Sequence, residues 1–261
     1  MRAWVMSLGL PLSVACAPST GSGTLAFDAY AAGPESLSGD GTYEFDTKAG
    51  YHVELTRADL RVGAVYLNEQ VPLSGAAERD CYLPGIYVAE VNRGITVDTL
   101  NPAPQAFPEQ GVALEERART AEVWLLGEST DIDAREDPHV IFAAEGTATR
   151  GDESWPFDAS LTIGSNRRIA PSDPKKPGDN PICSERIVSP IPIDLLPSAD
   201  GVLTMRIDPA AFFRDVDFDQ LDQVSDDPPL YRFRDVTDGQ PNINVYRGLH
   251  STRSAYSFDW E

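Results

Sequence analysis

The stretch Gly50–Leu67, with the sequence GYHVELTRADLRVGAVYL, decides the fold. Apolar and polar residues alternate from Tyr51 to Thr56, and a period of two residues is typical of a half-buried β-strand. The alternation slips near Arg57–Asp59 and again at Gly63, as a β-bulge or a sharp bend requires. The stretch therefore predicts strand structure that is interrupted at two points.

Short apolar or alternating segments with turn signals between them recur along the rest of the chain. They begin near Leu25 and Tyr43 and continue with Ile86–Val91, Ile95–Leu100, Thr120–Leu126, Val140–Thr149, Phe157–Ile163, Ile187–Leu196, Val202–Ile207, Ile243–Tyr246 and Tyr256–Trp260. The chain also has 20 Gly and 21 Pro, which suit many short strands better than long helices. This pattern predicts a mainly β fold, an antiparallel β-sandwich with about ten to twelve strands and long proline-rich loops.

One or two short helices interrupt the predicted strands. In Asp208–Phe213 (DPAAFF) an aspartate suited to an N-cap precedes a proline at the first helical position. We expect Phe212 or Phe213 to fold back onto the sheet. A second short turn is predicted over Asp217–Gln223.

Two proline-rich breaks, Asn101–Pro108 and Ala170–Pro181, show no strand pattern. Neither changes the composition enough to require a domain boundary, and the chain has no internal repeat. We therefore predict a single sandwich-like domain over residues 24–261.

The composition favours an acidic, folded protein. Apolar residues make up 41% of the chain, and 41 acidic against 21 basic side chains give a formal net charge of −20. Such a surface repels the nucleic-acid backbone, so we expect no nucleic-acid partner. It attracts divalent metals and basic peptides, although acidic surfaces also simply keep exported proteins soluble.

The first fifteen residues have the layout of an export signal. A single positive charge at Arg2 precedes the apolar run Ala3–Val14, which is too short to span a bilayer. Cys16 follows a small residue and resembles the lipobox cysteine of bacterial lipoproteins. The resemblance implies that residues 1–15 are removed, that Cys16 is acylated and carries a lipid such as palmitate, and that Ala17 directs the protein to the outer membrane. In the alternative, ordinary signal peptidase releases a soluble periplasmic or secreted protein.

Residues 16–23 have a flexible composition rich in Ser, Thr and Gly, as expected of a tether between a lipid anchor and a folded domain. The cysteine count agrees with acylation at Cys16. Cys81 and Cys183 then remain as an even pair, and export favours a disulfide between them. That bond would close a loop of about a hundred residues and stabilise the fold by ~4 kcal/mol in a chain-entropy description.

Two acidic runs are candidate calcium sites, because calcium prefers several hard oxygen ligands. Neither run matches the twelve-residue calcium-binding loop, so a solvated acidic loop is the alternative. The candidate ligands are Asp215, Asp217, Asp219 and Asp222 in one run, and Asp131 and Asp133 in the other. The three histidines, His52, His139 and His250, have no metal-site spacing in sequence and would bind copper only if the fold brought them together.

Motifs for catalysis are absent from the sequence. It has no Gly-x-Ser-x-Gly elbow, no phosphate-binding glycine loop and no His-Glu-x-x-His pattern, so we predict that the protein is not an enzyme, with a hydrolase as the remaining alternative. Exposed aromatic residues stack on sugars or anchor protein partners. The candidates for such a platform are Tyr82, Tyr87, Trp124, Trp155, Tyr231, Tyr246, Tyr256 and Trp260.

Several phrases along the chain resemble a family of secreted bacterial lipoproteins that has no established activity. They are Val53–Leu60, Val65–Leu67, Leu83–Val88, Asn180–Cys183, Asp208–Phe218 and Tyr256–Trp260. The layout of the first long strand is also similar to that of periplasmic copper-binding β-sandwich proteins. The resemblance brings no activity with it, and we expect a lipid-anchored, non-catalytic module at the cell envelope that binds a glycan, another ligand or an envelope protein through an edge or loop of the sandwich. The alternative is a periplasmic protein that binds calcium or copper.

Overall fold

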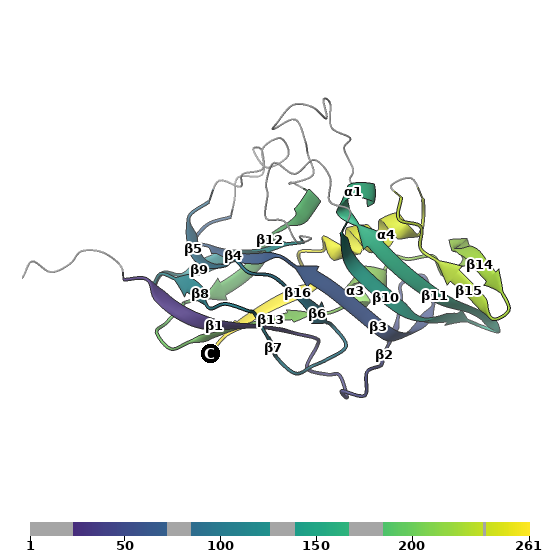
Figure 1. The fold of residues 1–261 in the computed structure, drawn as a ribbon, viewed down its shortest axis with the longest axis horizontal. Helices are drawn as coiled ribbons and strands as arrows, with labels where there is room; N and C mark the ends of the chain where they lie inside the picture. Colours follow the sequence, from purple (N-terminus) through teal and green to yellow (C-terminus); the bar gives the residue numbers. More distant parts are fainter. Residues whose placement is uncertain (1–22, 72–84, 126–138, 167–184, 237–238) are drawn as a thin grey trace, which may run out of the picture.

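The computed structural model describes residues 23–71, 85–125, 139–166, 185–236 and 239–261, which form 16 strands in two sheets (Figure 1). The nine-stranded sheet has the order β12 (Ile187–Leu195), β9 (Ala118–Trp124), β4 (Ala64–Asn68), β5 (Tyr87–Val91), β8 (Gly111–Ala113), β1 (Leu25–Ala32), β13 (Val202–Ile207) and β16 (Tyr256–Trp260), with β7 (Gln105–Ala106) also beside β1. The seven-stranded sheet has the order β14 (Asp222–Asp226), β15 (Pro229–Arg232), β11 (Glu153–Thr162), β10 (Val140–Arg150), β3 (His52–Val62) and β2 (Tyr43–Asp46), with β6 (Ile95–Asp98) also beside β3.

Both interruptions predicted in Gly50–Leu67 are confirmed. The register between β3 and β10 shifts between Glu145 and Gly146, where the pairing passes from Arg57 to Leu55. Gly63 separates β3 from β4, and these two strands belong to different sheets. The chain thus crosses from one sheet to the other at a glycine, whose N–H donates to the Trp124 carbonyl at 2.7 Å.

The mainly β, sandwich-like fold class is confirmed, and β13 and β16 cover the predicted residues. The direction of strand pairing and the number of strands differ from the prediction. Most strand pairs are antiparallel, but β1 pairs with β13 and β11 pairs with β15 in parallel. The number of strands in the described residues exceeds the prediction because β7, β8, β14 and β15 are too short or too polar to show a clear period of two.

The predicted helix after Asp208 is confirmed as α3 (Ala210–Phe213). The carboxylate of Asp208 accepts a hydrogen bond from the Ala210 N–H at 3.0 Å, and both Phe212 and Phe213 are fully buried. The predicted second turn contains a short 3₁₀ helix, η1 (Phe218–Gln220), after which the chain enters β14. The four-residue helix α1 (Ile163–Asn166) continues from β11.

The predicted strand Ile243–Tyr246 is wrong, because this segment lies in the helix α4 (Asn242–Leu249). Its buried residues are Asn242, Val245, Tyr246 and Leu249. Their spacing of three and four residues is that of one helix face, whereas a window of four residues shows only an apparent alternation. Among the described residues, no helix is both long and apolar enough to span a membrane.

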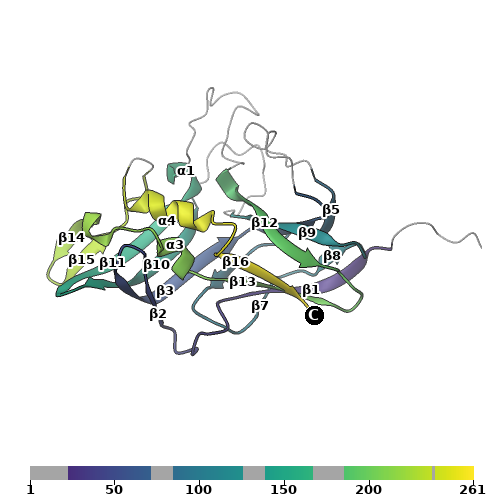
Figure 2. The same ribbon diagram turned by 180° about the vertical axis from the view of Figure 1, so that it is seen from behind.

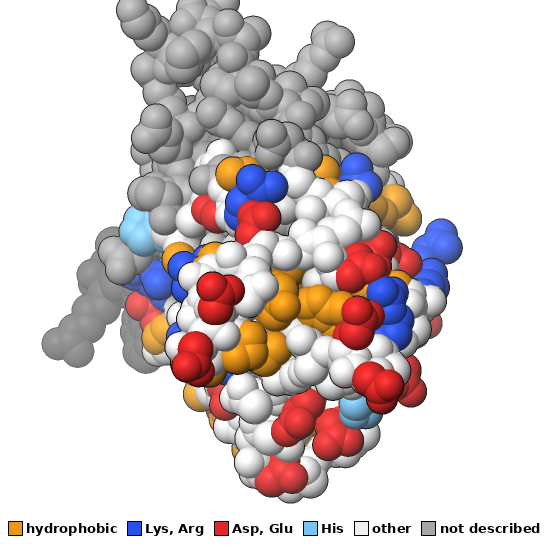
Figure 3. All heavy atoms as spheres, turned by 90° about the vertical axis from the view of Figure 1, so that its right-hand side faces the viewer, with side chains coloured by type: hydrophobic (Ala, Val, Ile, Leu, Met, Phe, Trp, Pro, Cys, Tyr) orange, Lys and Arg blue, Asp and Glu red, His pale blue; other side chains and the backbone are white. Residues whose placement is uncertain are grey.

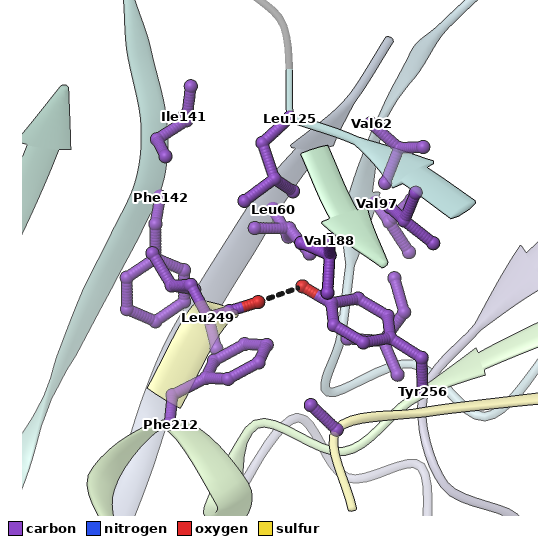
Figure 4. Packing of buried hydrophobic residues seen from close by; sticks show 14 of the residues in the cluster. Leu60, Val62, Val97, Leu125, Ile141, Phe142, Val188, Phe212, Leu249 and Tyr256 are labelled. Atoms are coloured by element: carbon purple, nitrogen blue, oxygen red, sulfur yellow. Dashed lines mark hydrogen bonds between the residues drawn. The ribbon is translucent and has the colours of Figure 1, made fainter. Parts of the chain in front are cut away.

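The two sheets contribute to one continuous core. In Figure 4, Phe142 of β10, Phe212 of α3, Leu249 of α4 and Tyr256 of β16 meet in its interior. Helices α3 and α4 contact each other and lie against the seven-stranded sheet, on the side seen in Figure 2. The Tyr256 hydroxyl donates to the Leu249 carbonyl at 2.7 Å and so ties β16 to the end of α4.

We expect Tyr256→Phe to lower the free energy of unfolding by about 1–3 kcal/mol, because it leaves the buried Leu249 carbonyl without its donor. Urea denaturation measures this change. The matched control is Tyr231→Phe, since the half-buried Tyr231 makes no hydrogen bond through its hydroxyl to any described residue. Equal losses of unfolding free energy in the two variants would contradict a stabilising role for the hydrogen bond from Tyr256 to Leu249.

Candidate functional site

Two of the predicted calcium ligands attach η1 to the seven-stranded sheet. Asp217 accepts a hydrogen bond from the Tyr51 hydroxyl at 2.8 Å, and Asp219 accepts one from the Arg150 guanidinium at 2.8 Å. The same guanidinium lies 4.3 Å from the centre of the Tyr51 ring. Burial, with a contribution from Asp217, raises the pKa of Tyr51 to about 12. These contacts give both carboxylates a structural role.

The other two predicted ligands in this run have separate cationic partners. Asp222 forms an ion pair with the Arg234 guanidinium at 2.6 Å, and Asp215 lies 3.5 Å from the Lys48 ammonium. On the end of the molecule that lies to the right in Figure 1, acidic side chains are spread over the surface rather than gathered in one cluster (Figure 3). Within the described ranges, no group of three or more His, Cys, Asp or Glu residues could hold a metal ion. The structure therefore gives a calcium site in this run no support.

The histidines also lie in different settings. His52 of β3 is exposed, and its Nδ1 is 3.0 Å from a carboxylate oxygen of Asp46. His250 is the C-cap residue of α4. Its Nδ1 lies 2.9 Å from the Tyr246 carbonyl oxygen, and its Nε2 lies 2.7 Å from the Glu185 carbonyl oxygen. His139 precedes β10. The described residues thus show no shared histidine site.

Six further predicted residues lie outside the described residues. They are Cys16, Cys81, Tyr82, Cys183, Asp131 and Asp133. Lipidation, the disulfide and calcium binding by the second acidic run therefore stay predictions.

A polar and aromatic cluster, which the sequence did not single out as a unit, lies on the nine-stranded sheet. Val65, Leu67 and Val123 point into the core. Because successive side chains of a strand point to opposite faces, their neighbours in β4 and β9 point to the outer face. We call this cluster the Glu122 face; it consists of Tyr66 and Asn68 of β4, Tyr87 and Glu90 of β5, and Glu122 and Trp124 of β9.

Strand register places Tyr66 at the centre of the Glu122 face. Tyr66 pairs with Glu122 across β4 and β9, and with Glu90 across β4 and β5. Its ring contacts those of Trp124 and Tyr87, at centroid distances of 5.6 and 5.2 Å. Burial, followed by the charges of Glu90 and Glu122, raises the pKa of Tyr66. One aromatic ring therefore lies between two carboxylates and two further rings.

Glu122 is fully buried and has no cationic partner among the described residues. One carboxylate oxygen accepts from the Asn68 amide at 2.9 Å, and the other accepts a long hydrogen bond of 3.4 Å from the Trp124 indole. Burial raises the pKa of Glu122 from 4.5 to about 7, and these two hydrogen bonds oppose the shift without cancelling it. The side chain therefore changes its charge near neutral pH.

Asn68 is also fully buried, and its Oδ1 has no hydrogen-bond partner in the described structure. An unpaired buried carbonyl costs about 1–3 kcal/mol, so such atoms are rare in folded proteins. Gly85 lies directly beside this oxygen, since a Cβ at position 85 would be only 2.7 Å from it. The absence of a side chain at Gly85 therefore avoids a clash with this buried oxygen.

The Glu122 face becomes more exposed toward β5. Tyr66 and Tyr87 are half-buried, and Glu90 is exposed. A hollow of about 230 Å³ is lined by Tyr87 and Glu90 of this face and by Val112, among others. The cluster thus combines a buried polar end, at Glu122 and Asn68, with an accessible aromatic and acidic end.

A wider hollow of about 770 Å³ lies over the outer face of β10 and β11. Its charged side chains are already paired, because Arg57 donates to Glu145 at 3.1 Å and Arg232 donates twice to Asp158, at 2.7 and 2.6 Å. This hollow therefore offers a ligand fewer unsatisfied groups than the Glu122 face does.

Sequence reasoning found part of the Glu122 face. Tyr87 and Trp124 belong to the predicted aromatic platform, whereas Glu122, Asn68, Tyr66 and Glu90 were missed. The available signal was the lone acid in Ala121–Leu125 (AEVWL), a charge within an otherwise apolar strand.

No protein-family model and no curated protein sequence matches this chain. The chain is similar in structure to MbnP from Methylosinus trichosporium, at 10% sequence identity and a TM-score of 0.38, over 91% of this chain and 98% of that one. A TM-score of this size is too low to establish a shared fold. The resemblance to secreted lipoproteins stays a prediction.

We expect Glu122 to make the fold less stable as pH rises. Folding raises the pKa of Glu122 from 4.5 to about 7. The contribution of this group to the free energy of unfolding is therefore full below about pH 4.5 and is lost by about pH 7. The loss is at most about 3 kcal/mol, at 1.36 kcal/mol per pKa unit. Urea denaturation from pH 4.5 to 8 should show this component in wild type and not in Glu122→Gln.

The control for this measurement is Glu54→Gln, which removes the same charge from an exposed position on β3. We expect this variant to keep the pH dependence of the wild type. Parallel pH profiles for wild type and Glu122→Gln would contradict the raised pKa.

Proposed function

We propose that this protein is an exported, lipid-anchored module of the cell envelope that binds its ligand on the Glu122 face. The anchor is Cys16, and residues 16–23 form the tether between the lipid and the sandwich-like domain. The binding is non-catalytic. A glycan, another small ligand or a segment of an envelope protein is the class of partner.

The observation that carries the proposal is the buried pair of Glu122 and Asn68 on the outer face of the sheet. Neither side chain contributes to the apolar core, and an ionised Glu122 costs the fold roughly 3 kcal/mol at pH above 7. Well-packed apolar residues at such positions commonly give equal or greater stability. Polar groups held at this cost, with a perturbed pKa, are typical of functional sites.

The contacts of Glu122 favour binding over proton transfer. A carboxyl group with a pKa of about 7 suits acid–base chemistry, but its partners are the Trp124 indole and the Asn68 amide. Both are donors that keep their protons at ordinary pH, so neither relays a proton to or from Glu122. Asn68 Oδ1 and the half-buried rings of Tyr66 and Tyr87 instead offer fixed contacts to a bound molecule.

Support for the envelope location comes from the sequence. The apolar run before Cys16 and the flexible composition after it fit export followed by anchoring. The net charge of −20 keeps the domain away from anionic lipid headgroups, so the lipid at Cys16 would be its main attachment to the membrane.

We expect metabolic labelling with a palmitate analogue to label the wild-type chain in a bacterial host and to leave Cys16→Ala unlabelled, because that variant has no thiol at the acylation position. Gel fluorescence of the immunoprecipitated protein measures the label. Ser13→Ala, which keeps the cysteine, is the control and should be labelled. Undiminished labelling of Cys16→Ala would end the anchor proposal and leave the Glu122 face unaffected.

We expect a small ligand to remain with the domain when it is purified from its own envelope under mild conditions. Native mass spectrometry should show an added mass that disappears on denaturation and is reduced at least about tenfold in Glu122→Gln, the fold-change of a lost contact of about 1.4 kcal/mol. Glu54→Gln is the matched control. An added mass that is equal in both variants would place the ligand elsewhere on the protein.

A further inference from the structure

We infer that the Glu122 face binds an organic cation with N–H donors, a primary ammonium or guanidinium group such as a lysine or arginine side chain carries. The cation lies over the Tyr66 ring and donates hydrogen bonds to Glu122 and to Asn68 Oδ1. This inference rests on the proposed function and names the chemical class of its ligand.

The free hydrogen-bonding groups at the buried end of the site are acceptors. Asn68 donates to Glu122 through its amide nitrogen. The amide oxygen of Asn68, Oδ1, receives no hydrogen bond in the described structure. A carboxylate accepts up to about four hydrogen bonds, and Glu122 receives only two from the described residues. A ligand that satisfies these oxygens must donate protons, so an anion does not fit.

Charge at the site also favours a cation. Asp158 and Asp219 are each neutralised by an arginine, whereas Glu122 contacts two neutral donors. Glu90 adds a second carboxylate at the exposed end, on the other side of Tyr66. A cation bound between Glu122 and Glu90 supplies the positive charge that the described residues do not provide there.

The aromatic rings add a preference for an organic cation. Tyr66 lies between the two carboxylates and is flanked by the rings of Trp124 and Tyr87. Ammonium and guanidinium groups are attracted to aromatic faces, by about 0.5–2 kcal/mol. The hollow of about 230 Å³ that Tyr87 and Glu90 line has room for a side-chain-sized group. A quaternary ammonium fits less well, because it cannot donate to Asn68 Oδ1.

A bound metal ion fits the described residues less well than an organic cation does. Calcium takes six to eight oxygen ligands, and no group of three or more acids or histidines in the described ranges could hold a metal. The available acceptors are few and suit a donor of two or three hydrogen bonds.

Binding of a cation favours the ionised form of Glu122, which gives the inference a second readout. Since the pKa of Glu122 is about 7 in the free protein, binding below that pH releases a proton. The affinity should therefore rise by about 30-fold between about pH 5.5 and pH 8, as the ionised fraction rises from about 3% to about 90%.

Titration calorimetry with Nα-acetyl-lysine methylamide and Nα-acetyl-arginine methylamide tests the inference on the full mature chain. We expect at least one of them to bind and the neutral analogue Nα-acetyl-norleucine methylamide to bind at least tenfold more weakly. Glu122→Gln should weaken binding at least tenfold and remove the rise of affinity with pH. Glu54→Gln should retain the wild-type affinity.

Gly85→Ala is the second variant, and it leaves every polar group of the site in place. Its new Cβ would crowd Asn68 Oδ1, so we expect a loss of affinity of at least threefold with an unchanged pH dependence. Wild-type affinity in Gly85→Ala would overturn the role of the Asn68 oxygen.

Several outcomes would overturn the inference. They are equal binding of the neutral analogue, tighter binding of tetramethylammonium than of either probe, Glu122-dependent binding of calcium in place of the probes, or no binding at all. If the probes fail while native mass spectrometry still shows a ligand that depends on Glu122, the ligand class is wrong and the proposed function stands. If that added mass is also unchanged in Glu122→Gln, the proposed function fails as well.

Discussion

The packing of Phe213 is the constraint on which much of the fold depends. This residue of α3 is fully buried, and its ring lies within 6.2 Å of five other phenylalanine rings. Those rings come from β2, β10, β11, η1 and the residue after β15: Phe45, Phe142, Phe157, Phe218 and Phe233. Each aromatic pair contributes about 0.5–1.5 kcal/mol beyond burial of its area. One short helix thereby fixes the seven-stranded sheet, the following turn and the last hairpin relative to one another.

The position of α3 also explains why the acids of the run after it are divided among different partners in the described structure. Phe213 and Phe218 both insert into the core, so the chain between and after them is held along its surface. The acids in this short segment then point toward different neighbours, Lys48, Tyr51 and Arg150 among them. Close spacing in sequence brings carboxylates together only where the backbone curls around a single point, as in a calcium-binding loop. Here the aromatic anchors prevent that curvature.

The sequence predicts local structure well where the signal is local. The period of two and the break at Gly63 define β3 and β4, and the Asp-Pro start defines α3. It fails for α4, because the face formed by Val245, Tyr246 and Leu249 is visible only over two helical turns. It also does not assemble the Glu122 face. Those residues come from three strands, and their contacts depend on the order of strands in the sheet, which no single segment encodes.

The cost of Glu122 to the folded protein is what makes the Glu122 face suitable for binding a cation. Above about pH 7 the carboxylate is already ionised and desolvated, and folding has already borne the penalty of roughly 3 kcal/mol. A cation that arrives at this site therefore meets a charge that has lost most of its competing water, held by Asn68 and Trp124. Preorganisation of this kind raises affinity because the ligand does not have to strip or orient the acceptor. A surface carboxylate such as Glu90 attracts the same cation from a distance but remains solvated, so it steers the ligand more than it holds it.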